Sequence, residues 1–341
     1  MKTIYIVFDT TKAENDKAWL NDVVERYAKT HDVQTRTIYT LSCLSRNFNR
    51  SLFFRIWVRI DVVFTILKLA RLLKRGDAVI FWSPYMACIW YFLTTNKWNC
   101  KVISMGWLQP RYSRMNRLEK KVFNSEDIII VTKNDMNKKQ LIDFFEVNNH
   151  EKVQIFPDVL NLKEGIYEPI TSRHPIVFMG GRSNRDWYSF LLYAREIPKI
   201  RFIGCASKKD WNLELELMQS DNVEMYFDIS LDEYNRYMMN SSFVLTLLKD
   251  LDKTSGLINI IRASQWGKIC ITTNIEAVRP YYPENLWELL LEKDDGCNVN
   301  KLKRLFSLSD RDYLKMAKMQ QEYVMKHYSP ETFVRLLKNN L

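Results

Sequence analysis

The segment TSGLINIIRASQWGK, residues 254–268, carries polar residues at a spacing suited to binding chemistry. Separations of four, three and four positions place four of them along one stripe of an α-helix: Ser255, Asn259, Arg262 and Trp266. Most other positions are apolar, so the sequence predicts a largely buried helix with a narrow hydrogen-bonding line. Thr254 or Ser255 is expected to cap its first turn, where free N–H groups and the helix dipole favour an anion. The alternative is a solvated helix face with an ordinary cap.

A second group of residues with binding potential is GGRSNRDW, residues 180–187. Glycine permits a tight turn that brings backbone amides to a phosphate, and Arg182 and Arg185 add guanidinium groups. A helix is expected to begin near Asn184. The alternative is a strand-to-helix turn with exposed arginines.

Acidic residues offer two further candidates. Asp9 follows the first apolar run, where its carboxylate either deprotonates a substrate hydroxyl or caps the following turn. DLD, residues 250–252, resembles the acidic pair that holds a divalent metal in GT-A glycosyltransferases. Because acidic triplets are common in loops, we expect no bound metal. The histidines at 31, 150, 174 and 327 lack the spacing of a zinc site.

Two basic clusters carry the remaining candidates. Residues 50–75 mix basic, aromatic and aliphatic side chains, which suits either an anionic membrane or a packed helix with snorkelling lysines and arginines. Arg55 and Arg59 lie on one helical face and the later basic residues lie nearly opposite, so two elements or a bend are expected. Arg111 and Arg114 belong to a second cluster, which either flanks a substrate cleft or begins a solvated helix.

The composition is that of a folded protein with an anionic partner. The chain has 341 residues, of which 47% are hydrophobic and 26% charged, and this balance excludes a disordered chain. Its length favours two domains, and its formal net charge of +10 favours phosphate-bearing molecules, nucleic acid or an acidic membrane. The six cysteines form no CxxC pair and are expected to be reduced core thiols of a cytoplasmic protein. The opening MKTIYIVFDTT favours a first strand over a signal peptide.

The uncharged segment at residues 78–96 approaches the length of a membrane-spanning helix. Ser83 and Pro84 divide it, however, and serine before proline is typical of a helix start. The sequence therefore predicts a strand, a turn and a helix.

Short apolar strands alternate with helical patterns along most of the chain, which is the rhythm of parallel α/β sheets. The irregular segment 157–175 divides this rhythm into two halves. We therefore predict an N-terminal domain at 1–160, a linker at 161–174 and a C-terminal domain at 175–341, with a long terminal helix that breaks at Ser329 and Pro330. Ligands of such sheets bind beyond the carboxyl ends of the strands. The predicted strands are 3–8, 33–39, 78–82, 101–105, 127–131, 152–156, 175–179, 199–203, 222–226, 242–247 and 269–272.

The order of elements in the second half, from VFMGGR to the helix TSGLINIIRASQWGKICITTN, resembles the C-terminal half of GT-B nucleotide-sugar glycosyltransferases. The resemblance implies two facing Rossmann-like domains, with the C-terminal helix packing back toward the N-terminal domain. It also implies a glycine and arginine loop that meets the donor diphosphate and a helix that meets the ribose and phosphates. The residues implicated in donor binding are Gly181, Arg182, Arg185, Thr254, Ser255, Gly256, Asn259 and Arg262.

One position departs from that pattern. Arg262 stands where these enzymes usually have the glutamate that accepts from the ribose, and a guanidinium fork suits the donor phosphates instead. With arginine at this position, the sequence resembles a polysaccharide-locus subgroup of the family more than its best-known members.

The resemblance implies a glycosyltransferase of the hexosyltransferase type that uses no metal or other cofactor. It would transfer a sugar from a nucleotide-diphosphate donor to a glycan or lipid-linked acceptor in bacterial surface polysaccharide synthesis. Asp9 is the candidate base, and Arg55, Arg59, Arg111 and Arg114 are expected on the acceptor or membrane side. A cytoplasmic location follows, with peripheral contact at the inner membrane face left open. The alternatives are a nucleotide-sugar epimerase of the same fold and a basic nucleic-acid-binding protein, although no nucleic-acid motif is present.

Overall fold

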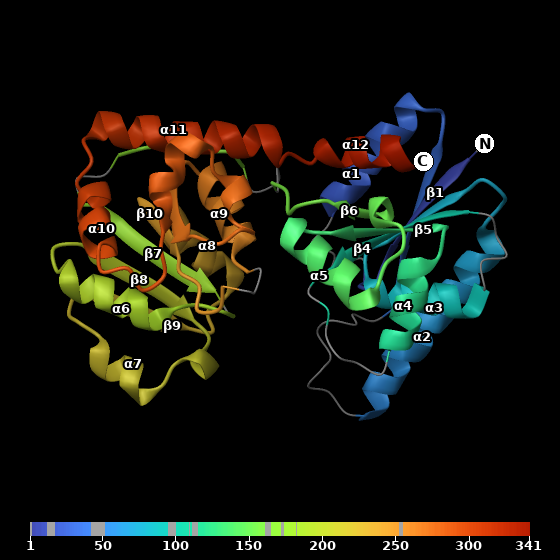
Figure 1. Ribbon diagram of the computed structural model, residues 1–341, viewed down its shortest axis with the longest axis horizontal. Helices are drawn as coiled ribbons and strands as arrows, with labels where there is room; N and C mark the ends of the chain where they lie inside the picture. Colours follow the sequence, from blue (N-terminus) through green and yellow to red (C-terminus); the bar gives the residue numbers. More distant parts are fainter. Residues whose placement is uncertain are drawn as a thin grey trace. The chain divides into compact units, whose positions relative to one another are not determined.

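The structure is a computed structural model of the chain (Figure 1). It describes residues 2–11, 18–41, 52–94, 100–108, 110, 115–160, 165–171, 174–181, 183–251 and 255–341, with side chains omitted at 52–55. The chain forms two compact units. The first unit comprises Met1–Pro157 and Pro330–Leu341, and the second comprises Asp158–Ser329.

The first unit is built on a six-stranded parallel sheet in the order β2-β1-β3-β4-β5-β6. β1 is buried along its whole length, because the sheet is covered on both faces and its TIYIVF sequence is rich in β-branched and aromatic residues. The edge strand β2 has the more polar sequence QTRTIY and is partly exposed. The strands are β1 Thr3–Phe8, β2 Gln34–Tyr39, β3 Ala78–Phe81, β4 Lys101–Trp107, β5 Ile128–Thr132 and β6 Val153–Ile155.

Helices connect these strands, as parallel pairing requires. The helices of the first unit are α1 Ala18–Thr30, α2 Leu52–Leu72, α3 Pro84–Thr94, α4 Asn116–Asn124, α5 Asp135–Phe145, the 3₁₀ turn η2 His150–Lys152 and α12 Thr332–Asn340. The expectation of two elements or a bend within residues 50–75 is wrong, because α2 is one continuous helix. It is apolar on two opposite faces, and periodicity alone does not distinguish that pattern from a break.

The described part of the uncharged segment, residues 78–94, forms a strand, a turn and a helix, as predicted. β3 ends at Phe81 and α3 begins at Pro84, where the missing N–H of proline costs nothing. Within the part of the chain that the structure describes, no helix is both long and apolar enough to cross a membrane.

The second unit contains another six-stranded parallel sheet, in the order β12-β11-β10-β7-β8-β9. Its strands are β7 Ile176–Gly181, β8 Arg201–Ala206, β9 Val223–Phe227, β10 Phe243–Thr246, β11 Ile269–Thr273 and β12 Leu290–Leu291. Its helices are α6 Trp187–Glu196, η4 Lys208–Asp210, α7 Leu213–Met218, α8 Leu231–Met239, α9 Leu257–Gln265, η5 Arg279–Tyr281, η6 Glu284–Leu289, α10 Asn298–Phe306 and α11 Asp310–His327. The prediction of two Rossmann-like domains is confirmed.

The end of the chain returns to the first unit, as predicted. α11 ends at His327, and after the break at Ser329 and Pro330 the helix α12 lies beside α1 (Figure 1). The Asn340 and Gln154 amides exchange two hydrogen bonds of 2.7 and 2.9 Å, which fix α12 beside β6.

Four cysteines are buried in the two cores, at 88, 100, 205 and 270, and Cys297 is exposed. All five are free thiols. Burial raises the pKa of Cys88 to about 12 and that of Cys270 to about 11, so both thiols stay protonated and unreactive at neutral pH. The four buried cysteines are the core thiols that the sequence predicts, but for the exposed Cys297 that prediction is wrong. Cys43 lies outside the described residues.

The irregular segment between the sheets is attached to the second unit. Tyr167 N–H donates to the Gln265 carbonyl (3.2 Å), and Gln321 Nε2 donates to the Tyr167 carbonyl (2.8 Å). Gly267, just beyond α9, has a φ of 67°, and a Cβ there would lie 2.7 Å from the backbone nitrogen of Pro169. A glycine is therefore required both for the left-handed turn and for the close approach of the two backbones.

We predict that Gly267→Ala lowers the free energy of unfolding by about 2 kcal/mol or more, because it adds left-handed strain and a backbone clash. Gly296→Ala is the matched control, because a Cβ at Gly296 meets nothing within 4 Å. Chemical denaturation of both variants provides the measurement. Equal stability of the two variants would contradict the proposed packing of segment 165–169.

Candidate functional site

Two loops of the second unit meet at one edge of its sheet. β7 and β10 pair in parallel, so the loops that follow them begin side by side. Arg185 and Leu248 form an antiparallel bridge, and Asp186 N–H donates to the Leu247 carbonyl (3.1 Å). The loop after β7 is therefore joined to the loop after β10 at the edge where ligands of such sheets bind.

Asn184 provides most of that junction. Its Nδ2 donates to the Asp250 carbonyl (2.9 Å) and to Ser255 Oγ (3.1 Å), and its Oδ1 accepts from Asp250 N–H (2.7 Å). Its φ of 52° is left-handed, a conformation that asparagine tolerates better than most residues. The helix that the sequence predicts near Asn184 begins three residues later, at Trp187, with Asp186 as its N-cap.

Arg185 lies between two glycines. Its Nε donates to the Gly180 carbonyl (2.9 Å) and its Nη1 to the Ser183 carbonyl (3.0 Å). A Cβ at Gly181 would lie 2.5 Å from Arg185 Nε, and one at Gly256 would lie 3.3 Å from Nη2. Both glycines have positive φ, of 147° and 81°. The guanidinium therefore occupies the space that a side chain at 181 would take, whereas at 256 a Cβ would clash mainly with Thr246 Cγ2, at 2.4 Å.

Among the described residues, carbonyl oxygens accept the hydrogen bonds of the Arg185 guanidinium. No carboxylate pairs with this guanidinium among the residues that the structure describes. Burial lowers the pKa of Arg185, which means that the charged form is poorly solvated. Arg185 is half-buried, and a cation removed in part from water without a counter-ion is costly, so a bound anion would compensate it.

The first turn of α9 adds further positive potential to this site. Its N-cap is Gly256 and no side chain caps it, so the expectation of a Ser255 cap is wrong. Ser255 Oγ instead accepts from Asn184. The backbone N–H groups of Leu257 and Ile258 have no acceptor within the described ranges. These N–H groups and Arg185 are donors of the kind that bind anions.

A hydrogen-bonded chain holds α8, α9 and β7 together behind this site. Tyr234 Oη donates to Asn259 Oδ1 (3.1 Å), and Asn259 Nδ2 donates to the Gly180 carbonyl (2.9 Å). Burial raises the pKa of Tyr234 to about 12, so its hydroxyl remains a donor. The side-chain groups of Asn259 thus bond within the unit and fix the glycine loop. Tyr234 was missed, because nothing in its local sequence distinguishes it from a core aromatic.

Arg262 lies one turn beyond Asn259 on α9 and is half-buried. Its guanidinium carbon is 5.7 Å from the ring centroid of Trp266, within range of a cation–π contact. Its positive charge also acts on the Tyr234 hydroxyl and partly opposes the rise in its pKa that burial causes. The predicted stripe thus extends from the first turn of α9 to Trp266.

The acidic candidates lie in different units. In the first unit, Asp9 follows β1 and accepts a hydrogen bond from the Ser83 hydroxyl, beyond the neighbouring strand β3. Burial raises the pKa of Asp9, and the Ser83 hydrogen bond opposes that rise. In the second unit, the backbone of Asp250 bonds to Asn184. No cluster of three histidine, cysteine or acidic residues suited to a metal exists among the described residues.

Several predicted site residues lie outside the described residues: Arg111, Arg114, Arg182, Asp252 and Thr254. Arg55 belongs to α2, but its side chain is also outside them. Arg59 is exposed on α2.

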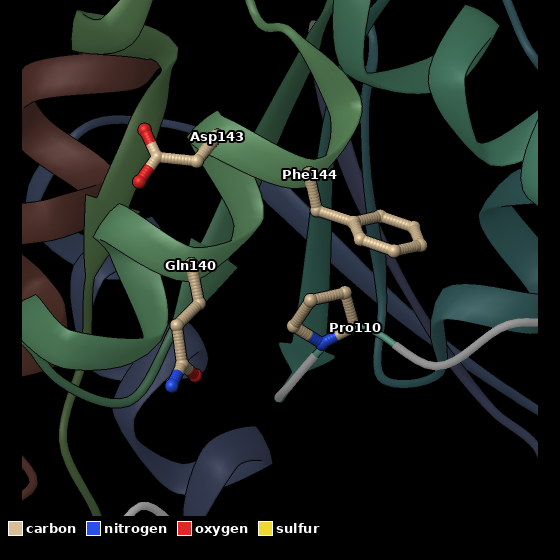
Figure 2. Close-up of a pocket in the computed structure, with 4 residues that line it drawn as sticks. All are labelled: Pro110, Gln140, Asp143 and Phe144. Atoms are coloured by element: carbon tan, nitrogen blue, oxygen red, sulfur yellow. The ribbon is translucent and has the colours of Figure 1, made fainter.

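The first unit also contains an open pocket of about 540 Å³, lined by Pro110, Gln140, Asp143 and Phe144. Three of these side chains project from α5, as Figure 2 shows. Gln140 Oε1 is buried and lacks a hydrogen-bond donor among the described residues. With the carboxylate of Asp143, it offers acceptors for ligand hydroxyls next to the apolar surfaces of Phe144 and Pro110. This pocket could not be predicted from the sequence, because its α5 residues are separated by ordinary helical spacings.

No family model and no curated protein matches the sequence. Solved structures do match the fold. Sucrose-phosphate synthase from Thermosynechococcus elongatus superposes with a TM-score of 0.70 at 13% identity, covering 99% of this chain and 98% of that one. HepE of Anabaena in complex with UDP-glucose gives 0.66 at 11% identity, over 99% and 100% of the two chains.

A trehalose-6-phosphate protein of E. coli bound with UDP-2-fluoro glucose gives a TM-score of 0.68 at 9% identity, over 98% of both chains. These structural neighbours are GT-B glycosyltransferases, and they match nearly the full length of this chain. With two Rossmann-like units and a terminal helix that returns to the first, the chain has the GT-B fold.

Proposed function

We propose that the protein transfers a sugar from a nucleotide-diphosphate donor to a glycan or lipid-linked acceptor, in the synthesis of a surface polysaccharide. The observation that carries this proposal is the anion site formed by Arg185 and the first turn of α9. The GT-B fold supports it, because neighbours of that fold have been solved with UDP or UDP-glucose bound. A lipid-linked acceptor implies peripheral contact with the membrane, which is part of the proposal.

The donor diphosphate would bind where the two loops of the second unit meet. The Nε and Nη1 groups of Arg185 donate to backbone carbonyls. Its Nη2 faces Gly256, which precedes the N–H groups of Leu257 and Ile258, for which the described residues provide no acceptor. These donors suit a diphosphate, which carries several acceptor oxygens close together. Arg262 would add a second guanidinium one turn further along the helix.

Hydrogen bonds hold the loops of the proposed diphosphate site in place, which favours binding of the donor. Asn184 fixes the loop after β7 to that after β10, and Asn259 fixes the carbonyl of Gly180. The donors that would meet the diphosphate are therefore held in place in the free protein. Binding then costs little conformational entropy.

Asp9 is the proposed general base for the acceptor hydroxyl. Its raised pKa makes it a stronger base than an ordinary aspartate, while the Ser83 hydroxyl holds its carboxylate in one orientation. We further propose that transfer needs no metal ion, because Arg185 and Arg262 supply the positive charge that a divalent cation would otherwise bring to the diphosphate.

We predict that Arg185→Ala weakens binding of UDP-glucose, or of whichever nucleotide sugar binds best, by about 1.5–3 kcal/mol, the scale of a hydrogen bond to a charged group. Arg262→Ala is expected to act in the same direction. Isothermal titration gives the dissociation constants and thermal melting gives the stability of each free variant.

The matched control for these variants is Arg201→Ala, because Arg201 is an exposed arginine of the same unit that pairs with Glu224. It should bind the donor as the unaltered protein does. If Arg185→Ala instead lowers the melting temperature strongly and leaves donor affinity unchanged, the guanidinium serves the fold and the proposed site is refuted.

We predict that Asp9→Asn lowers the transfer rate by about 10²–10⁴-fold without changing donor affinity. The pKa of Asp9 is raised in the folded state, so its charge costs stability at pH values above the folded-state pKa. Asp9→Asn should therefore raise the melting temperature at pH 7.

Ser83→Ala, which removes the opposing hydrogen bond, should shift the acid limb of the rate profile to higher pH. An unchanged transfer rate in Asp9→Asn would eliminate Asp9 as the base.

We predict that transfer proceeds undiminished in excess EDTA. The assay follows release of nucleoside diphosphate from the donor, with and without a glycan acceptor. Loss of activity in EDTA and its recovery on addition of manganese or magnesium would contradict the metal-free proposal. Interconversion of the donor sugar without an acceptor would indicate an epimerase instead.

A further inference from the structure

The helix α2 is apolar on two opposite faces. One face packs in the core of the first unit through residues at helical spacing: Val58, Val62, Ile66, Leu69 and Leu73. The opposite face carries Trp57, Ile60, Phe64 and Leu67, separated by three, four and three positions, and all four are exposed. Phe64 is 66% exposed and Trp57 is 47% exposed. Helices on the surface of globular proteins normally have a polar outer face, so this one requires an explanation.

We name these four exposed residues the outer stripe. At 1.5 Å per residue, it runs for about 15 Å along the helix. α3, which contacts α2, also has exposed apolar side chains, Phe92 and Leu93. Contiguous apolar surface of this kind marks a site of interaction with another molecule.

Basic residues accompany the outer stripe. Arg71 continues it four positions after Leu67, Lys68 lies one turn beyond Phe64, and Arg59 is placed on the other side of the stripe. All three are exposed, and none pairs with a carboxylate within the described ranges. The one acidic residue among the described side chains of α2, Asp61, is buried.

This charge pattern identifies the class of partner. An apolar stripe with cations around it and no exposed carboxylate suits a surface that is apolar inside and negatively charged outside. A protein partner or a second copy of this chain would need an apolar face with acidic residues around it. A bilayer with anionic headgroups has both properties over its whole surface, and tryptophan and phenylalanine are typical of side chains that enter its interface.

We propose that the outer face of α2 docks the protein on an anionic membrane, with Trp57, Ile60, Phe64 and Leu67 entering the interface. Arg59, Lys68 and Arg71 contact the headgroups. The helix lies in the plane of the membrane, because its other face stays packed on the sheet. The surface is independent of the anion site of the second unit, and a lipid-linked acceptor would be met at this surface.

The test is sedimentation of the protein with vesicles of phosphatidylcholine containing phosphatidylglycerol, and with vesicles of phosphatidylcholine alone. We expect binding to the anionic vesicles that weakens as sodium chloride is raised, and little binding to the neutral ones. Ile60→Gln/Phe64→Gln should lower the partition coefficient for anionic vesicles about tenfold or more, because it removes apolar burial without changing the charge.

The matched control is Leu213→Gln/Leu217→Gln on α7. It changes two leucines that are 69% and 78% exposed and have the same spacing of four residues, but lie in the second unit. This variant should bind vesicles as the unaltered protein does. A second pair tests the charges: Lys68→Gln/Arg71→Gln should weaken binding about fivefold per residue removed, whereas Arg201→Gln/Arg304→Gln should not.

Two results would overturn the proposal. One is vesicle binding that is absent, or equal in Ile60→Gln/Phe64→Gln and in its control. The other is a dimer in solution that Ile60→Gln/Phe64→Gln converts to a monomer, which would make the stripe a self-association face. Donor affinity, measured on the same variants, should not change, so failure of the docking surface and failure of the proposed transferase are separate outcomes.

Discussion

The half-buried guanidinium of Arg185 determines much of the structure around the candidate site. Its charge is shared between the carbonyls of Gly180 and Ser183, and its volume requires glycine at 181, while at 256 a Cβ would meet Thr246 Cγ2 at 2.4 Å as well as the guanidinium. These requirements explain why α9 begins at a left-handed glycine and not at a capping serine. The loop after β7 and the start of α9 therefore hold the Arg185 guanidinium beside the backbone N–H groups of the first turn of α9. This arrangement becomes favourable when an anion binds.

The two units differ in the kind of surface that they offer to a ligand or partner. The second unit has its hydrogen-bonding groups at the carboxyl edge of its sheet, where asparagine side chains join separate loops. The first unit carries an apolar helix face with cations around it and an aspartate whose charge is poorly solvated. This difference agrees with one unit that binds a charged, water-soluble donor and another that meets a less polar partner.

The strands were predictable because a buried parallel strand needs an uninterrupted apolar run, and such runs are short and easily seen between polar segments. The two-residue strand β12 was not predicted, because Leu290 and Leu291 are too few to form a pattern. In the site, the glycines and Arg185 were predictable from their residue types. The roles of Asn184 and Tyr234 were not, because each depends on a partner 25 or more residues away. The exposure of the outer stripe was also hidden, since a sequence shows that a helix has two apolar faces but not which of them the fold covers.

The return of α12 to the first unit affects how the chain folds. Arg26 in α1 bonds Glu331 across 305 positions, and Gln154 bonds Asn340 across 186. The whole second unit is encoded between the two parts of the first, so it leaves the ribosome before the first unit has its last helix. Until then, Phe156 lacks the ring of Phe333, which packs 4.8 Å from it. The first unit is thus begun first and completed last, and a nascent chain would pass through a stage with a finished second unit and an open apolar face on the first.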